Sequence, residues 1–282
     1  MSSLSNIRTR LSAVTNIKQI ATSMEMVASA RFKKAQDQAK QAQFYIAKVH
    51  EILEKISAAC TEFKHPLFIQ RQVRKSVLVV VSSDRGLCGA YNSTLLAAAD
   101  KFLQERRSEE VSLILLGKKA IQYYQNKPRL IVATFPGWSG KITLPQIQKL
   151  SEQLISGFVS NHFDAVWLAY TKFISLMHRE VRVEKFLPIG KPEAKQKILN
   201  YIFEPGPELL LEQLLPRYCM TKIESLLNEA HASELAARIF SMKAAAKNAE
   251  EMIKQLTLER NKTRQASITR ELLETTASMR ES

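Results

Sequence analysis

The chain has 282 residues and a formal net charge of +14, from 41 Lys and Arg against 27 Asp and Glu. Its 45% hydrophobic content is enough for a buried core. No apolar run reaches the ~18 residues of a membrane-spanning helix. The three cysteines are widely spaced and form neither a disulfide framework nor a metal-binding pair, which is typical of reduced thiols in the cytosol. The positive charge favours an acidic partner, and composition leaves nucleic acid, anionic lipid and an acidic protein surface all open.

The first 65 residues contain neither glycine nor proline and carry a heptad pattern. Of the sixteen a and d positions between Leu4 and Ile56, fourteen are apolar, and the exceptions are Lys18 and Glu25. Polar residues at such positions commonly fix the register between paired helices. The pattern predicts a coiled-coil helix over residues 1–65, which must find a partner because it is longer than a compact domain is wide.

After Pro66 the periodicity changes to that of an α/β domain. Apolar runs of strand length alternate with helical stretches, which indicates a mostly parallel sheet covered on both faces. The predicted strands are Ser76–Ser82, Val111–Leu116, Leu130–Phe135 and Ala165–Tyr170, and the predicted helices are Ser93–Arg107, Lys118–Gln125 and Leu144–Phe158. A fifth strand, Arg179–Phe186, alternates more and is expected at an edge. This predicts a Rossmann-like domain over residues 70–200 and leaves the strand order open.

The glycine pattern of this domain argues against a nucleotide site. The loop Ser83–Gly89 has two glycines three residues apart instead of the G-x-G-x-x-G spacing, and an Asp and an Arg stand where a pyrophosphate would approach. Gly117-Lys118-Lys119 lacks the upstream glycine and the following Ser or Thr of a Walker A motif. No nucleophile, base and orienting group occur together. We therefore expect no catalytic residue, no cofactor and no metal.

The C-terminal part is again free of glycine and proline, from Arg217 to Ser282. Its heptad positions are expected at Ile223, Leu226, Ala230, Ser233, Ala237, Phe240 and Ala244, and then, after a shift, at Met242, Ala245, Ala249, Met252 and Leu256. Two long helices, 1–65 and 208–282, then bracket the domain, and their stretches without glycine or proline are matched in length. The simplest arrangement is an antiparallel coiled coil with the α/β domain inserted between its two helices, because the two apolar faces cover each other.

Three sequence segments resemble the gamma subunit of F-type ATP synthases. The first is IATSMEMVA at residues 20–28, followed by Arg31 and KAQ at 34–36; the second is SDRGLCG at 83–89. The third comprises MKAA at 242–245, NK at 261–262, RQASIT at 264–269 and EL at 271–272. Together they span the whole chain.

The resemblance implies the rotor shaft of a proton-translocating enzyme, without a catalytic site of its own. In that family the two terminal helices enter a ring of three alpha and three beta subunits, while the α/β domain meets the epsilon subunit and the c-ring. It implies no nucleic-acid partner, membrane contact only through the c-ring, and, with no presequence, the cytoplasmic side of a bacterial inner membrane. The residues that it assigns to contacts with beta subunits are Met24, Arg31, Lys34, Arg85, Arg264, Gln265, Thr269 and Glu271.

Two other functions fit parts of the sequence. A nucleic-acid-binding coiled coil fits the charge and the two helices, but no aromatic platform or groove-reading motif is present. A dinucleotide-dependent enzyme fits the α/β domain, but not its glycine spacing.

Overall fold

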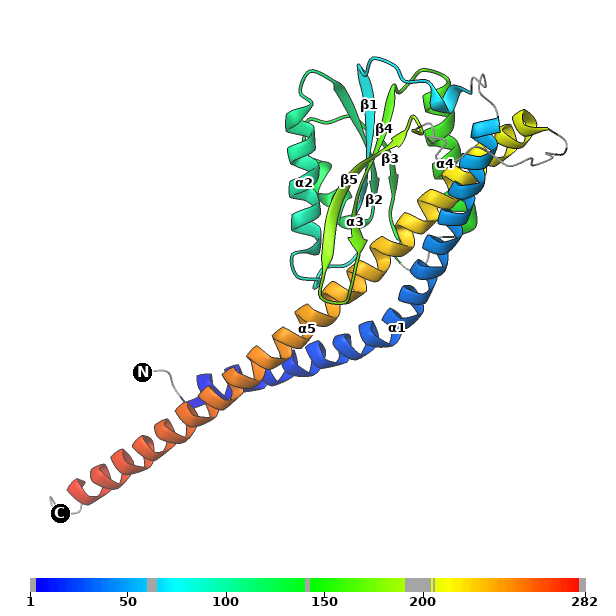
Figure 1. Cartoon of the computed structure of the whole chain (residues 1–282). Coiled ribbons are helices and arrows are strands. Elements are labelled where there is room, and N and C mark those ends of the chain that lie inside the picture. The colour runs from blue at the N-terminus through cyan, green and yellow to red at the C-terminus, as the bar shows by residue number, and fades with distance from the viewer. Residues whose placement is uncertain (1–3, 60–64, 140–142, 191–203, 205, 279–282) are drawn as a thin grey trace. The chain divides into compact units, whose positions relative to one another are not determined.

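The computed structural model describes residues 4–59, 65–139, 143–190, 204 and 206–278 (Figure 1). The chain forms two compact units. The terminal unit comprises residues 1–29 and 238–282, and the central unit comprises residues 30–237. Two long helices contribute to both units, α1 (Leu4–Ala59) and α5 (Pro207–Ser278). Among the described residues, no helix is long and apolar enough to cross a membrane.

The central unit is built on a five-stranded sheet with the strand order β3-β2-β1-β4-β5. The strands are β1 (Lys75–Val81), β2 (Glu110–Leu116), β3 (Ile131–Phe135), β4 (Ala165–Phe173) and β5 (Arg179–Leu187). The first four are parallel, and β5 is antiparallel to β4 at the sheet edge. The predicted strands and the edge position of the fifth are confirmed.

The sheet is buried on both faces because helices cover each side (Figure 1). On β1, Leu78 and Val80 point to the face covered by α2 (Tyr91–Glu105) and α3 (Lys118–Tyr124). Val77 and Val79 point to the opposite face, covered by α4 (Leu144–Val159) and by parts of α1 and α5. An unbroken apolar strand is what two covered faces require, since successive side chains alternate between them.

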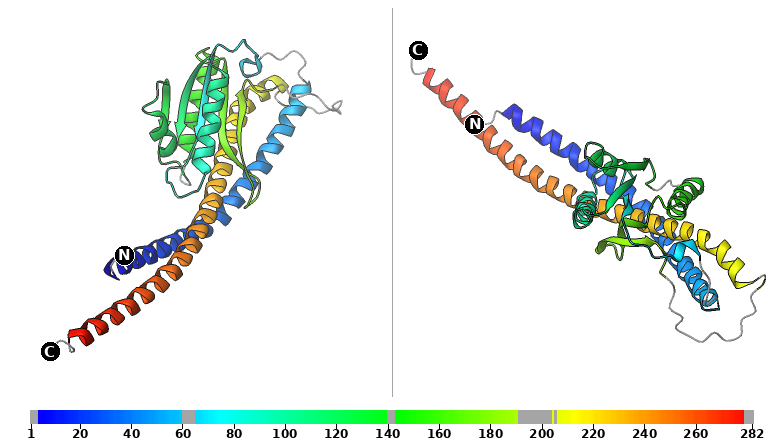
Figure 2. Two further views of the ribbon diagram at one scale, coloured as in Figure 1. Left: turned by 90° about the vertical axis from the view of Figure 1, so that its left-hand side faces the viewer. Right: turned by 90° about the horizontal axis from the view of Figure 1, so that it is seen from above.

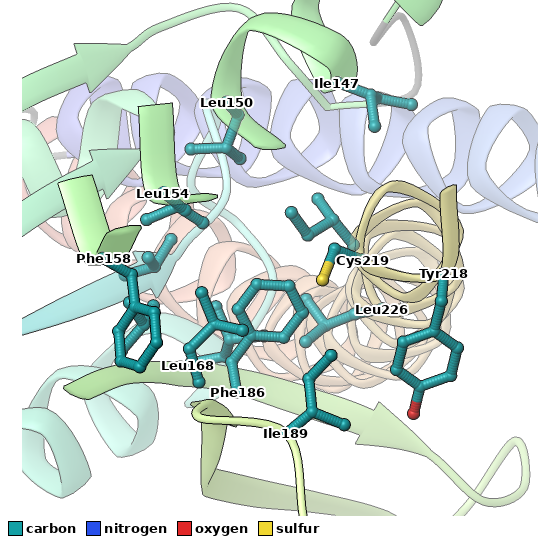
Figure 3. Close-up of a cluster of buried hydrophobic side chains, with 14 of the residues drawn as sticks. Ile147, Leu150, Leu154, Phe158, Leu168, Phe186, Ile189, Tyr218, Cys219 and Leu226 are labelled. Atoms are coloured by element: carbon teal, nitrogen blue, oxygen red, sulfur yellow. The ribbon is translucent and has the colours of Figure 1, made fainter. Parts of the chain in front are cut away.

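The larger of the two cores lies between the sheet and α4, α1 and α5. Leu154 and Phe158 of α4 converge on Leu168 and Phe186 of the sheet, with Leu226 of α5 beside them (Figure 3). This core therefore joins the sheet to the inner faces of both long helices.

Thr143 starts α4 with a capping box, in which the side chains of Thr143 and Gln146 each accept a hydrogen bond from the other residue's backbone N–H.

Within each unit α1 and α5 run antiparallel and side by side (Figures 1 and 2). In the central unit, the His50 ring stacks on the Tyr218 ring with centroids 6.0 Å apart, whereas Gln43, earlier in α1, bonds Glu229, later in α5. In the terminal unit, Ile7 shares a buried cluster with Leu256. All sixteen predicted a and d positions of α1 are buried or half-buried and none is exposed, which confirms the heptad.

The structure corrects the prediction for the C-terminal helix in two respects. The helix runs from Pro207 through Pro216 to Ser278, within one residue of the predicted start, but it has 72 residues against 56 in α1, so the two helices are not matched in length. Pro207 suits the first position because the first-turn N–H groups have no partner within the helix. The expected heptad positions Ala244 and Met252 are exposed, and Ile253 packs in the cluster where Met252 was expected.

Candidate partner interface

The C-terminal end of α5, in the terminal unit, is exposed on all sides from Arg264 to Leu273. It extends beyond the position of Leu256, which packs with Ile7 near the start of α1. Three large apolar side chains are exposed there, Ile268 (49%), Leu272 (62%) and Leu273 (65%). An isolated helix with exposed apolar side chains on several sides is typical of a segment that a partner encloses.

Four of the predicted contact residues lie on this exposed segment, namely Arg264, Gln265, Thr269 and Glu271. The Thr269 hydroxyl donates to the Gln265 carbonyl at 2.9 Å, which orients it along the helix and leaves its oxygen free to accept. The segment thus presents a guanidinium, an amide and a carboxylate to the outside, between its apolar side chains.

Met24 lies on α1 in the same unit and is half-buried. On this helix, Ile17, Ile20, Met26 and Val27 are all more than half exposed. Sequence reasoning missed these four because it followed only the a and d positions. The signal was present, since large apolar residues outside the heptad positions of a helix that already has a partner point to a second partner.

Arg31 and Lys34 lie on α1 in the central unit, where both are exposed. Lys33, Lys40 and Lys48 are exposed on the same helix, against Asp37. Farther along, hydrogen bonds from Lys48 and Lys55 lower the pKa of Glu51 to about 2. This region of α1 is therefore a basic surface that attracts carboxylates.

Arg85 lies in a loop at the carboxyl end of β1 whose backbone is tied to the next two strand ends. The Asp84 carboxylate accepts hydrogen bonds from the backbone N–H groups of Lys118 (3.1 Å), Gly137 (2.7 Å) and Ser139 (2.9 Å). The Ser82 hydroxyl accepts from Ala120 N–H at 2.8 Å. The protein's own side chains thus accept hydrogen bonds from backbone N–H groups at the start of α3. In a nucleotide-binding fold, N–H groups at a helix start donate to a phosphate instead.

The same loop holds two side chains outward. The Ser83 hydroxyl donates to the Arg85 carbonyl at 2.7 Å, while the Arg85 side chain is exposed. Leu87 is 58% exposed and has a φ of 62°, a conformation that costs a leucine free energy. The motif pointed to Arg85 but not to Leu87, because sequence does not reveal a positive φ.

The eight predicted residues are therefore divided between the two units, five in the terminal unit and three in the central unit. The part of the chain that the structure describes contains no group of three or more His, Cys, Asp or Glu side chains able to hold a metal ion. The arrangement offers extended surfaces for macromolecules.

Comparison with known proteins identifies relatives along the entire chain. A family model described as ATP synthase matches residues 3–280. An ATP synthase gamma chain of Protochlamydia amoebophila is 48% identical over 279 residues, covering 98% of both chains. One from Geotalea daltonii is 37% identical over 278 residues, covering 97% of this chain and 96% of its own.

Two solved structures share the fold. A chain of the Euglena gracilis mitochondrial ATP synthase superposes with a TM-score of 0.68 at 16% identity, covering 98% of this chain and 93% of its own. A chain from the central stalk and c-ring of the Tetrahymena thermophila enzyme has a TM-score of 0.63 at 22% identity, with coverages of 80% and 99%. From the full-length relatives and the family model, the chain belongs to the gamma subunits of F-type ATP synthases.

Proposed function

We propose that this chain is the central rotor shaft of an F-type ATP synthase. It couples proton-driven rotation of the c-ring to sequential conformational change in the catalytic beta subunits, or pumps protons when ATP hydrolysis drives it in reverse. The observation that supports this most is the α5 segment Arg264–Leu273, which is exposed on every side and combines polar with large apolar side chains. Such a segment suits a sleeve formed by partner subunits.

The physical basis of coupling is differential contact. One asymmetric helix pair surrounded by three equivalent sites presents a different face to each of them. A shaft can bias a site only by the difference between its contacts with that site's two conformations. In this proposal catalysis stays on the partners, and the chain supplies no catalytic residue and binds no cofactor.

We assign the shaft to residues 1–65 and 208–282 and the base to the α/β domain, residues 70–200. The proposed partners are three alpha and three beta subunits around the shaft, with the epsilon subunit and the c-ring at the base. The complex would lie on the cytoplasmic side of a bacterial inner membrane, touching it only through the c-ring. Nucleic acid is not a partner in this proposal.

The contacts with beta subunits are assigned by charge and exposure. Arg31 and Lys34 on the basic surface of α1, and Arg85 on the loop after β1, face acidic loops of the beta subunits. Arg264, Gln265, Thr269 and Glu271 hydrogen-bond to loops near the end of the shaft, and Met24 faces the same subunits. An exposed cation opposite an acidic loop helps to fix how the two subunits align, and it adds little to their affinity.

The test is the double variant Arg264→Ala with Gln265→Ala, assembled into the complete enzyme in proton-tight vesicles. We expect ATP synthesis at a fixed proton gradient to fall several-fold relative to ATP hydrolysis, because the variant loses contacts made in only some rotary states. The matched control is Arg129→Ala with Gln104→Ala, which removes the same side-chain types from exposed positions of the central unit. Unchanged synthesis in the Arg264 and Gln265 variant would refute these contacts.

A further inference from the structure

An open cavity of about 290 Å³ lies at the surface of the central unit, between α1, the β4–β5 edge of the sheet and α5. Its size is at the lower end of the range for small-molecule sites, roughly 300–1,000 Å³. Ile46 and Leu226 form apolar walls. Its polar lining comes from three parts of the chain, with His50 on α1, Tyr170 and Glu184 on the sheet, and Tyr218, Lys222 and Glu229 on α5.

Glu229 is the unusual group in this lining. Its side chain is only 7% exposed, and its Oε2 atom has no hydrogen-bond partner among the described residues. The Gln43 side chain of α1 hydrogen-bonds the Glu229 carboxylate, so one carboxylate oxygen has a donor and Oε2 has none among the described residues. A buried carboxylate oxygen without a donor costs free energy, and proteins rarely leave one without a donor.

The other polar groups contact one another only loosely across the cavity. Tyr170 Oη lies 3.5 Å from Glu184 Oε2, and Tyr218 Oη lies 3.5 Å from His50 Nδ1. Lys222 Nζ lies 3.7 Å from Glu184 Oε1. These separations are at or beyond the limit of a good hydrogen bond, so the oxygens keep the capacity to accept hydrogen bonds from a further donor.

A cluster elsewhere in the same unit shows what a complete arrangement looks like. There, Tyr124 Oη donates to Asp100 at 2.8 Å and Lys127 Nζ donates to the same carboxylate at 3.0 Å. The same side-chain types in the cavity are more than half an ångström farther apart. The polar groups of the cavity are therefore more loosely packed than those of the Asp100 cluster.

The charges of the lining determine what kind of group is missing. Lys222 lies nearest Glu184, while Lys172 and Arg182 act on the Glu229 carboxylate only through their charge, without a hydrogen bond to its Oε2 atom among the described residues. Two carboxylates and the oxygens of two tyrosines are all able to accept hydrogen bonds. Figure 3 shows the Tyr218 hydroxyl directed away from the packed apolar side chains.

We propose that this cavity binds a small aliphatic ammonium ion, whose N–H groups donate to Glu229 Oε2 and to the oxygens of Glu184 and Tyr170. The methylene chain of the ligand packs on Ile46 and Leu226. Glu229 supplies the charge that selects the ligand, and the site serves to hold α1 and α5 against the sheet. This inference does not depend on the rotary function, because it concerns the chain alone.

The experiment is isothermal titration calorimetry of the purified full-length chain with 1,4-diaminobutane, and with uncharged 1,4-butanediol as the ligand control. We expect one saturable site for the diamine and none for the diol. Glu229→Gln should weaken diamine binding at least about tenfold, as expected for loss of a charge-assisted hydrogen bond. Glu224→Gln, five residues earlier on α5 and outside the cavity lining, should bind as the unaltered chain does.

A second variant tests the same site by a change that does not depend on the folding of Glu229→Gln. Ala47 is exposed at the cavity and lies on the surface of α1, so Ala47→Phe should narrow the cavity without disturbing the core. Circular dichroism confirms that each variant is folded, and Ala47→Phe should also lose the site. Absence of saturable binding to the unaltered chain, equal binding of diol and diamine, or undiminished binding by folded Glu229→Gln or Ala47→Phe would each overturn the proposal.

Discussion

Lys18 of α1 and Glu250 of α5 form an ion pair between the two helices of the terminal unit, with Nζ 3.3 Å from Oε2. Lys18 occupies an expected heptad position, where the sequence predicted a residue that fixes register. Hydrogen bonding to Lys18, with a smaller effect of Lys254, lowers the pKa of Glu250. Both side chains are more than a third exposed, so we expect the pair to choose the alignment of the helices more than to stabilise them.

The first prediction tests this register role. Lys18→Glu should lower the melting temperature only slightly, by about 2–4 °C or less, because the pair is solvent-screened. Adding Glu250→Lys should restore it by reversing the pair. Thermal unfolding followed by circular dichroism checks this, and a double variant no more stable than the single one would show that the two residues are not coupled.

The second prediction concerns Asp84. Burial by itself raises its pKa, but hydrogen bonds from Ser139, Gly137 and Lys118 outweigh this and lower it. Because the folded pKa lies below the unfolded value, the stabilisation is present above the unfolded pKa and is lost as pH falls through the folded pKa. Asp84→Ala should therefore cost about 1–2 kcal/mol at pH 7, toward the lower end for a charged hydrogen-bond acceptor because the side chain is partly exposed.

Denaturant unfolding of Asp84→Ala at pH 7 and at pH 3 measures this difference. The gap between the variant and the unaltered chain should shrink in acid. A gap independent of pH would mean that the carboxylate's charge does not hold the loop. Asp37→Ala is the control, because Asp37 is exposed on α1 in the same unit and its loss should leave stability nearly unchanged at both pH values.

The third prediction compares two glycines with positive φ. Gly117 has a φ of 90°, and a Cβ placed there would lie 2.2 Å from the Ser82 carbonyl oxygen. Gly137 has a φ of 78° but open space around it. Gly117→Ala should thus cost more than about 3 kcal/mol, whereas Gly137→Ala should cost about 1–2 kcal/mol from conformation alone. Equal losses in denaturant unfolding would contradict the close approach to Ser82.

The fourth prediction concerns the pH dependence of stability at Glu229 without ligand. Burial raises its pKa, the nearby Glu184 adds to this, and the Gln43 hydrogen bond opposes it. A carboxyl group whose folded pKa is raised destabilises the fold as pH rises from the unfolded pKa through the folded pKa. Glu229→Gln should therefore unfold at a higher denaturant concentration than the unaltered chain at pH 8, with the difference smaller at pH 4.

Other charged or ionisable side chains surround Glu229. His50, Tyr170, Glu184 and Lys222 line the cavity with it, and Lys172 and Arg182 lie near enough to act on its charge. The control Glu224→Gln keeps all of these and should show no pH-dependent gain. If Glu229→Gln is less stable than the unaltered chain at pH 8, the buried carboxylate does not lower the free energy of unfolding, and the prediction is wrong.

The fifth prediction concerns thiol reactivity. Cys219 is completely buried in the large core, and this burial raises its pKa to about 12, with Lys222 opposing. Since the thiolate is the reactive form, only about one thiol in ten thousand would be ionised at pH 8. Iodoacetamide should leave Cys219 unmodified in the native chain and alkylate it after denaturation, as peptide mass spectrometry can show. Rapid native modification would indicate that α5 detaches from the sheet.

Much of the fold was predictable because its signals are local. The heptad of α1 and the apolar strands Lys75–Val81 and Glu110–Leu116 appear in the sequence with the periods of a helix and of a doubly covered sheet. The loop around Arg85 and the exposed polar segment of α5 were also recognised. The predicted range 208–282 includes Pro216, where α5 continues although a proline ordinarily interrupts a helix, because packing along the rest of the helix overrides that preference. The sequence did not predict that α5 is longer than α1, with 72 residues against 56.

The sequence by itself therefore determined the element types, the pairing of two terminal helices and the family, because periodicity and motifs lie within short stretches. Only the tertiary structure decided the strand order, the use of Asp84 as an internal acceptor for three distant N–H groups, and the cavity around Glu229. Each of these depends on groups that lie far apart in the chain. The folded positions of the neighbouring residues decide whether a buried polar group finds a hydrogen-bond partner.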